Sequence, residues 1–244
     1  MAIEPINFVV FLMGPTASGK TELAIEISKH INSKLISVDS ALIYRGMDIG
    51  TAKPSKEILT AYPHELVDIC EPEDSFSVTE FISLAKEHIK SALAEGKLPI
   101  LVGGTSFYFN ALEHGLSELP SSTDESRKHF NDLLKSEGSV KLHSKLTEID
   151  PKSAARIHSN DSQRVTRALE VFHLSGETLS KLQGKKNQNK LDLNIKKIVL
   201  MPDRAVLHQR IEQRFIKMIK DGFLNEVEIL RKNSKLNLDL ASMR

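Results

Sequence analysis

Short apolar runs and helical periods alternate over the first hundred residues of the chain. Four apolar runs predict buried strands, at residues 8–13, 35–38, 65–69 and 99–102. Between the first two runs, residues 20–31 repeat apolar positions at helical spacing. Ser77 and Glu80 form a capping box, which predicts a helix that runs to Glu95 and stops at Gly96. Strands that alternate with helices in this way indicate a parallel α/β sheet.

The pattern changes after Gly115. Residues 122–182 contain several helical stretches and no convincing strand. Ser122 and Glu125 offer a second capping box at the start of this stretch, and a later helix is expected to be capped near Asn160. This part of the chain is therefore predicted to be a helical insertion.

A polar tract separates the insertion from the rest of the chain. Residues 184–193 predict a loop or linker, and the apolar residues of 195–201 predict a strand that returns to the sheet. A long amphipathic helix follows and breaks at Gly222. The expected domain limits are 1–117 and 195–244 for a discontinuous α/β core, 118–185 for the helical insertion and 186–194 for the linker.

Composition places the chain among soluble proteins. Of its 244 residues, 40% are hydrophobic and 27% charged, as in ordinary globular domains. Phe8–Met13 is the longest apolar run, far shorter than the roughly 20 residues that cross a bilayer, and no signal peptide is visible. The single cysteine, Cys70, excludes an internal disulfide and a multi-cysteine zinc site. We expect a cytoplasmic monomer with no membrane partner.

The formal net charge of +1 conceals an asymmetry along the sequence. Residues 1–150 carry 14 Lys+Arg and 22 Asp+Glu, and residues 151–244 carry 19 and 10. A basic half joined to an acidic half is typical of proteins with a polyanionic partner, nucleic acid above all. Solvated, lysine-rich helix faces would explain the same numbers, so charge alone leaves both interpretations open.

A phosphate-binding motif of the form G-x-x-x-x-G-K-[ST] lies between the first predicted strand and the first predicted helix. Its residues are Gly14, Pro15, Thr16, Ala17, Ser18, Gly19, Lys20 and Thr21. In such a loop, backbone amides and the helix N-terminus converge on phosphate oxygens, the lysine reaches a terminal phosphate and the threonine hydroxyl holds Mg²⁺. The motif therefore predicts diphosphate binding.

The motif leaves open which diphosphate is bound. An enzyme that hydrolyses nucleoside triphosphates needs an apolar strand that ends in an aspartate, which holds Mg²⁺. The residues before Asp68 are one candidate. The stronger strand at 99–102 ends instead in Gly103, Gly104 and Thr105. The ligand is therefore either a nucleotide or another diphosphate.

Two polar residues lie at or near the carboxyl ends of predicted strands. Asp39 comes after the second strand, and Thr105 lies at the end of the fourth. The carboxyl ends of parallel strands line the ligand crevice of such sheets, so both should face the phosphate loop. Asp39 fits a general base and equally a residue that caps its own loop, and Thr105 has the same ambiguity.

Five tracts of the chain resemble the bacterial tRNA dimethylallyltransferase family, at residues 14–21, 36–54, 101–112, 155–172 and 207–215. The sequence DSALIYRGMDIGTAKP at 39–54 is highly specific for it. The resemblance implies a P-loop NTPase-like parallel sheet core with a helical insertion domain. It also implies transfer of a dimethylallyl group from dimethylallyl diphosphate to N6 of the adenosine 3′-adjacent to the tRNA anticodon. The family continues beyond residue 244, which implies truncation at the C-terminus.

The same resemblance implies roles for individual residues. Asp39 matches the family's general base, while Thr105 and Arg214 join Lys20 and a Mg²⁺ ion at Thr21 in stabilising the leaving diphosphate. The implied tRNA contacts are Asp39, Ser40, Ala41, Leu42, Thr105, Arg127, Gln163, Arg164, Val165, Thr166 and Arg167.

Three other classes of protein share part of these features. A small-molecule or nucleoside kinase is the main alternative, and it requires a magnesium-binding aspartate on the strand that here ends in glycine. A prenyltransferase that acts on free adenine nucleotides would not need the basic half. An RNA-binding GTPase-like module would carry a guanine-reading N-K-x-D motif, which the sequence lacks.

Overall fold

The structure, a computed structural model, describes residues 6–183, 190–237 and 240–243. Contacts divide the chain into two compact units, Met1–His114 with Lys190–Arg244, and Gly115–Asn189. The expected domain limits stay a prediction, and residues 186–189 of the expected linker lie outside the described residues.

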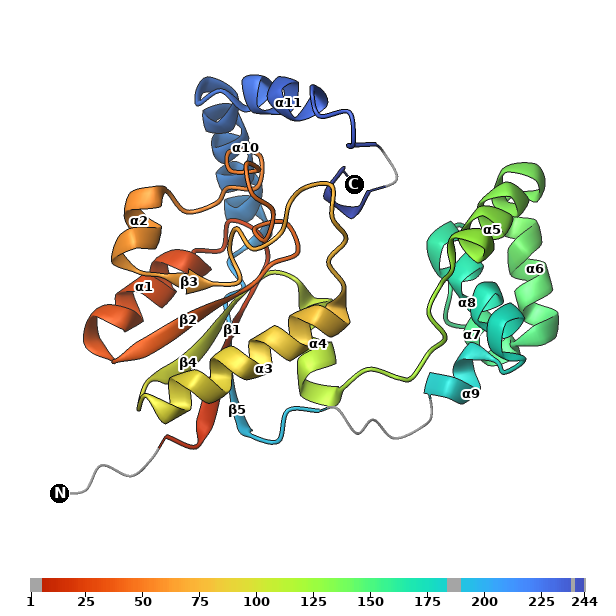
Figure 1. Cartoon of the computed structure of the whole chain (residues 1–244), viewed down its shortest axis with the longest axis horizontal. Helices are drawn as coiled ribbons and strands as arrows, with labels where there is room; N and C mark the ends of the chain where they lie inside the picture. Colours follow the sequence, from red (N-terminus) through yellow and green to blue (C-terminus); the bar gives the residue numbers. More distant parts are fainter. Residues whose placement is uncertain (1–5, 184–189, 238–239, 244) are drawn as a thin grey trace. The chain divides into compact units, whose positions relative to one another are not determined.

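The first unit is built on a five-stranded sheet in the order β3-β2-β4-β1-β5, with every pair of neighbours parallel (Figure 1). Its strands are β1 Phe8–Met13, β2 Ser33–Val38, β3 His64–Glu65, β4 Leu98–Gly103 and β5 Asn194–Val199. In register, Gly103 pairs with both Met13 and Val38, so three strands end side by side. The segments that follow β1, β2 and β4 therefore meet at one edge of the sheet.

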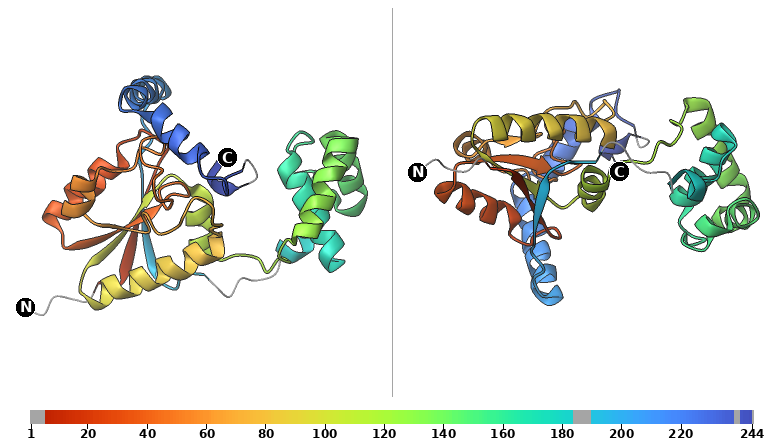
Figure 2. Two further views of the ribbon diagram at one scale, coloured as in Figure 1. Left: turned by 45° about the horizontal axis from the view of Figure 1, so that its top comes forward. Right: turned by 90° about the horizontal axis from the view of Figure 1, so that it is seen from below.

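Helices cover both faces of this sheet. Helix α1 (Lys20–His30) lies on one face, and helices α3 (Val78–Ala94) and α4 (Ser106–His114) lie on the other (Figure 2). Alternation along β1 separates the two cores, because Val10 and Leu12 pack with Ala24 of α1, whereas the ring of Phe11 lies 5.0 Å from that of Phe109 in α4. The sheet is thus buried on both sides, as in other α/β folds.

The remaining helices of this unit are α2 Lys56–Ala61, α10 Arg204–Lys220, α11 Phe223–Arg231 and the 3₁₀ turn η1 Ala241–Met243. Helix α10 follows β5 and has the amphipathic pattern expected from the sequence, but none of its residues is buried. Phe215, for example, is 55% exposed within the described part of the chain. Among the described residues, no helix is long and apolar enough to cross a bilayer.

The second unit contains only helices among its described residues. They are α5 Asp124–Glu137, α6 Ser139–Ile149, α7 Pro151–Ala154, α8 Ser162–Ser175 and α9 Leu179–Gln183. Leu142, Leu146, Val165 and Ala168 are completely buried at its centre, and Phe130 packs against them. This arrangement gives the unit a hydrophobic core of its own.

The third predicted strand is much shorter than expected. Residues 65–69 were predicted to be extended, but β3 ends at Glu65. Leu66 and Asp68 adopt φ values of 65° and 55°, in the left-handed region, which a strand does not allow. The chain therefore turns away from the sheet directly after β3.

The first helix start of the second unit differs from the prediction. The capping box of α5 is formed by Thr123 and Ser126, not by Ser122 and Glu125. The Ser122 hydroxyl instead donates a hydrogen bond to Glu170, 2.7 Å away on α8. Helix α8 is capped near Asn160 as expected, by Asp161, whose carboxylate accepts from the third amide of the helix.

Candidate active site

The phosphate-binding motif joins the end of β1 to the start of α1. Gly19 caps α1 with φ 90° and provides no side-chain hydrogen bond, so the amides of the first turn remain open to a ligand. Gly14 passes so close to β5 that a Cβ atom there would lie 2.5 Å from the backbone oxygen of Leu200. The loop thus forms a compact site for an anion at a helix N-terminus.

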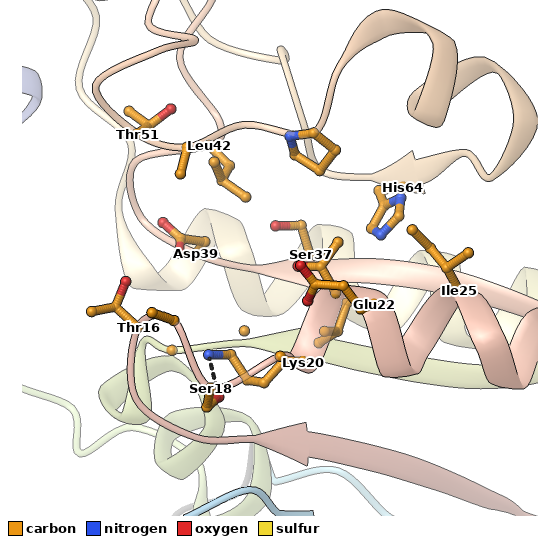
Figure 3. Close-up of a pocket in the computed structure, with 18 of the residues that line it drawn as sticks. Thr16, Ser18, Lys20, Glu22, Ile25, Ser37, Asp39, Leu42, Thr51 and His64 are labelled. Carbon is orange, nitrogen blue, oxygen red and sulfur yellow. Dashed lines mark hydrogen bonds between the residues drawn. The ribbon is translucent and has the colours of Figure 1, made fainter. Parts of the chain in front are cut away.

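Lys20 closes back over this loop. Its ammonium donates hydrogen bonds to the Pro15 carbonyl at 2.6 Å and to the Ser18 hydroxyl at 3.3 Å (Figure 3). Burial lowers the pKa of Lys20, the charge of Asp39 acts to raise it, and the charge of Arg214 lowers it further. A bound phosphate would offset both the burial and the repulsion from the arginine.

A cavity of about 820 Å³ lies above the loop. Lys20, Thr21, Asp39 and Arg214 all line it, together with Gly103 and Gly104 from the end of β4. Figure 3 shows Thr16, Lys20 and Asp39 around the same space. Phosphate-binding groups, carboxylates and cations from distant segments of the sequence are therefore brought into one cavity.

Asp39 caps its own loop, as one of the two sequence interpretations predicted, and its role as a general base stays a prediction. It follows Val38 at the end of β2, and its Oδ1 accepts a hydrogen bond from the Ala41 amide at 2.9 Å, which caps the turn. The same carboxylate lines the cavity. The local cap thus fixes the direction in which the carboxylate presents its oxygens to a ligand.

Thr105 lies beside the cavity rather than in its lining. Its backbone amide donates to the Val38 carbonyl, and its Oγ1 accepts from the Ser40 amide, both at 3.2 Å. The hydroxyl oxygen is therefore oriented by the segment that follows Asp39, and its own proton can be donated elsewhere. Of the three predicted catalytic residues, Asp39 and Arg214 line the cavity and Thr105 joins the two strand ends at its border.

Helix α10 brings two arginines to the phosphate loop. Arg214 donates a short hydrogen bond to the Thr16 hydroxyl, and Arg210 donates to the Ala17 carbonyl at 3.5 Å. Both arginines line the cavity. The positive charge at this position comes from a helix nearly 200 residues further along the chain.

Asp68, the candidate magnesium ligand of a kinase, is not among the residues that line this cavity. Lys53, whose side chain is only 3% exposed, donates to Asp68 at 2.6 Å, to Asp48 at 2.7 Å and to the Tyr44 carbonyl at 2.6 Å. Asp68 thus neutralises a buried lysine, and β4 ends in glycine where a kinase would have its aspartate.

Comparison with known proteins assigns this architecture to a family. The family described as IPP transferase matches residues 42–244. The chain belongs to this family. The tRNA dimethylallyltransferase of Ruthia magnifica subsp. Calyptogena magnifica is 60% identical over 244 residues, which are 100% of this chain and 80% of that protein. The corresponding protein of Vesicomyosocius okutanii subsp. Calyptogena okutanii (strain HA) is 58% identical over the same shares.

Solved structures of the IPP transferase family have the same fold. The tRNA isopentenylpyrophosphate transferase of Bacillus halodurans is 38% identical, with a TM-score of 0.64 over 97% of this chain and 73% of that one. A eukaryotic dimethylallyltransferase acting on tRNA is 26% identical, with a TM-score of 0.72 over 93% of this chain and 56% of that one. The P-loop NTPase-like α/β prediction is confirmed.

The predicted tRNA contacts fall into two groups. Asp39, Ser40, Ala41, Leu42 and Thr105 lie in the first unit, and Arg127 and residues 163–167 lie in the second. Asp39 and Leu42 line the cavity, whereas Ser40 and Ala41 belong to the turn beside it.

Within the second group, two members are held by the unit itself. The Val165 side chain is completely buried and so is not presented at the surface. The Arg167 guanidinium donates to Ser122 at 2.7 Å, to Glu170 at 2.6 Å and to the Pro120 carbonyl at 2.7 Å. These bonds tie α8 to the segment before α5. Thr166 is half-buried, and its hydroxyl donates a hydrogen bond to the Ser162 carbonyl of the same helix. The side chains of Gln163, Arg164 and Arg127 are exposed.

Several polar residues of the cavity were not predicted from the sequence, among them Ser37 and His64. Ser37 is 3% exposed, and its Oγ has no hydrogen-bond partner among the described residues. His64 lies on β3 with its Nδ1 2.7 Å from the Tyr62 carbonyl, and burial lowers its pKa. Ser37 was predictable, because residues 37 and 39 share one face of an extended strand. His64 was not, because only the pairing of β2 with β3 brings it to the cavity.

Proposed function

We propose that this chain transfers a dimethylallyl group from dimethylallyl diphosphate to N6 of the adenosine 3′-adjacent to the anticodon in tRNA, releasing diphosphate. The observation that carries this proposal is that the Asp39 carboxylate shares one cavity with a phosphate loop and two cations. A diphosphate on the loop and a nucleophile beside Asp39 would then be neighbours. The names of the related proteins support tRNA as the acceptor and the dimethylallyl group as the group transferred.

The reaction replaces one bond to carbon with another. The adenine N6 lone pair forms a bond to the first carbon of the dimethylallyl group, and the bond between that carbon and the diphosphate oxygen breaks. The diphosphate leaves with the electron pair. Lys20, Arg214 and the open amides of α1 lie where they would stabilise this developing negative charge.

The second part of the chemistry is removal of the N6 proton. Adenine N6 is a poor nucleophile because its lone pair is delocalised into the ring, so the proton must leave as the new bond forms. Asp39 is proposed to accept it. Thr105, whose hydroxyl oxygen accepts from the Ser40 amide, is proposed to donate a hydrogen bond to the reacting groups at the border of the cavity.

The oxygens around the loop fit a magnesium ion. Mg²⁺ prefers oxygen ligands, keeps several waters and commonly binds through substrate phosphates with one or two protein groups. The Thr21 and Ser37 hydroxyls and the Asp39 carboxylate line the cavity, and the Ser37 oxygen is buried without a partner among the described residues. We propose that Thr21 holds the ion, with Asp39 and Ser37 near it. The ion would supply charge neutralisation of the diphosphate.

A base cannot be alkylated at N6 while it is stacked, so the target adenosine must be turned out into the cavity. We propose that Asp39, Ser40, Ala41, Leu42 and Thr105 contact the turned-out nucleotide. Arg127, Gln163 and Arg164 are proposed to contact the RNA elsewhere through exposed side chains. A cytoplasmic location and a monomeric state remain predictions.

The experiment that tests this proposal compares two labelled donors. The protein is incubated with tRNA and either dimethylallyl diphosphate labelled in the prenyl group or ATP labelled in its γ-phosphate. We expect label from the first to appear in tRNA, and none from the second in any acceptor. Phosphoryl transfer from ATP without prenyl transfer would overturn the proposal in favour of a kinase.

A further inference from the structure

Glu226 makes an unusual contact between distant parts of the first unit. It lies in the first turn of α11, and its carboxylate accepts hydrogen bonds from three successive backbone amides, those of Asp48, Ile49 and Gly50, at 2.8, 2.7 and 2.9 Å. Hydrogen bonds to a charged acceptor are roughly twice as strong as neutral ones. A single side chain thus satisfies three donors of a loop that lies 176 to 178 residues earlier in the chain.

An apolar contact accompanies the carboxylate. A Cβ atom on Gly50 would lie 2.4 Å from the Phe223 ring, so only glycine allows the ring to pack against this loop. The Phe223 ring also meets Phe215 of α10 edge-on, with centroids 6.4 Å apart. Helix α10 and the loop are therefore both attached to the start of α11 (Figure 1).

Both attached elements belong to the cavity. Thr51, Ala52 and Pro54 follow directly after the amides that Glu226 binds, and all three line the cavity. On the other side, α10 carries Arg210 and Arg214 to the phosphate loop. Glu226 itself does not line the cavity. Its contact sets the distance between one wall of the cavity and the helix that supplies its arginines.

We propose that Glu226 is a positioning residue for the diphosphate substrate, an inference that rests on the proposed function. Without the carboxylate, three amides lose their acceptor, and the 48–54 loop and α10 lose their common anchor. Arg214 then holds the diphosphate less well. The catalytic carboxylate is affected less, because Asp39 is fixed by β2 and by its own turn. The substitution should therefore raise KM for dimethylallyl diphosphate with little change in kcat.

Three variants test the proposal. Glu226→Ala removes the acceptor. Glu226→Gln keeps the size of the side chain but loses its charge, and its NH₂ group then faces one of the backbone N–H donors and cannot accept from it. Glu228→Gln, at an exposed position two residues later on α11, removes the same charge without the contact. Binding of inorganic diphosphate with magnesium is measured by titration calorimetry, and prenyl transfer to tRNA by steady-state kinetics, with thermal midpoints recorded for each protein.

We expect the dissociation constant of diphosphate and the KM to rise about tenfold in Glu226→Ala and about threefold in Glu226→Gln, with kcat within about threefold. Glu228→Gln should match the wild type. Wild-type diphosphate binding in both Glu226 variants, or a fall in kcat without a change in KM, would overturn the proposal. If Glu226→Ala fails to fold, Glu226→Gln decides. Absence of prenyl transfer by the wild type would instead contradict the proposed function, and diphosphate titration would still test Glu226.

Discussion

At the scale of single residues, one substitution separates the structural role of Asp39 as a cap from its proposed role as a general base. Asp39→Asn can still accept the hydrogen bond of the Ala41 amide, so the turn should persist. The amide cannot take up the N6 proton, and general-base contributions are typically about 10²–10⁴-fold. We expect a loss of that size in the single-turnover rate at saturating tRNA, with diphosphate affinity nearly unchanged. If Asp39→Asn reacts at the wild-type single-turnover rate, Asp39 is not the general base and serves only to cap its turn.

Substitution of Thr21, unlike that of Asp39, should lower the affinity for diphosphate. Thr21→Ala removes the hydroxyl that is proposed to hold magnesium, so diphosphate affinity in the presence of Mg²⁺ should fall, by about tenfold. In the presence of a chelator the wild type and the variant should bind diphosphate equally. Thr21→Ser, which keeps the hydroxyl, serves as the control and should restore the effect of magnesium. Equal loss with and without magnesium would contradict the assignment of this ligand.

Which site residues the sequence reveals depends on how local their signal is. The phosphate loop, Asp39 and Thr105 carry motifs or follow strands directly, and the structure brings the loop and Asp39 together. Lys53 and Glu226 could not be found in this way. Each side chain bonds to backbone groups of the 44–50 segment. Every residue carries such backbone groups, so the sequence does not reveal which of them will be bonded.

At the scale of elements, α8 shows how one helix face combines two kinds of arginine. Arg167 is bonded to a Glu170 carboxylate whose side chain is 6% exposed, whereas Arg164 is 74% exposed. Removing the arginine leaves the charge of a buried carboxylate without its cation. We therefore expect Arg167→Ala to lower the free energy of unfolding by about 3 kcal/mol.

The matched control for this prediction is Arg164→Ala on the same helix. It should change the free energy of unfolding by less than about 0.5 kcal/mol, as exposed substitutions usually do. Urea denaturation followed by circular dichroism measures both values. Equal stability of the two variants would mean that Arg167 is as dispensable to the fold as a solvated side chain.

Glu170 should make this unit sensitive to acid. Burial acts to raise the pKa of Glu170, but hydrogen bonds from Ser126, Arg167 and Ser122 outweigh it, and the pKa lies below its usual 4.5. A carboxyl with a depressed pKa stabilises the fold fully above its unfolded pKa, and that contribution is lost as the pH falls through the folded value. Between pH 6 and pH 3 the thermal midpoint of the wild type should therefore fall more than that of Glu170→Gln.

A comparison variant makes the acid prediction specific. Glu148 is exposed on α6, and Glu148→Gln should follow the wild type across the same pH range. If Glu170→Gln loses as much between pH 6 and pH 3 as the wild type does, the hydrogen-bonded carboxylate is not the source of acid sensitivity.

The ends of elements explain most differences between the predicted and observed folds. The helix from residue 78 was predictable because its capping box is encoded by two neighbouring residues, Ser77 and Glu80. The box expected at Ser122 failed because a distant carboxylate, Glu170, competes for that hydroxyl. Local patterns thus predict where elements lie, and tertiary hydrogen bonds decide their first and last residues.

At the scale of the whole molecule, the acidic and basic halves of the sequence do not correspond to an acidic and a basic structural unit. The unit at 115–189 carries 12 Lys+Arg and 10 Asp+Glu, and the rest of the chain carries 21 and 22. The basic C-terminal residues return to the acidic N-terminal ones, because β5 pairs with β1 in the same sheet. Net charge per unit therefore gives little support to an RNA partner, and that prediction depends on where individual cations lie.

Arg164 provides the sharpest test of RNA contact, because its side chain is exposed and its loss should leave the fold intact. If it contacts a phosphate, Arg164→Glu should weaken tRNA binding at every salt concentration and reduce the slope of log affinity against log salt by about one. The slope is the decisive quantity, because it counts released counterions and is insensitive to small changes in active protein. Lys141→Glu makes the same charge change at a position 67% exposed on α6 and should leave the slope unaltered. If the two reversals change the slope equally, tRNA responds to the overall charge of the unit, and α8 holds no specific contact.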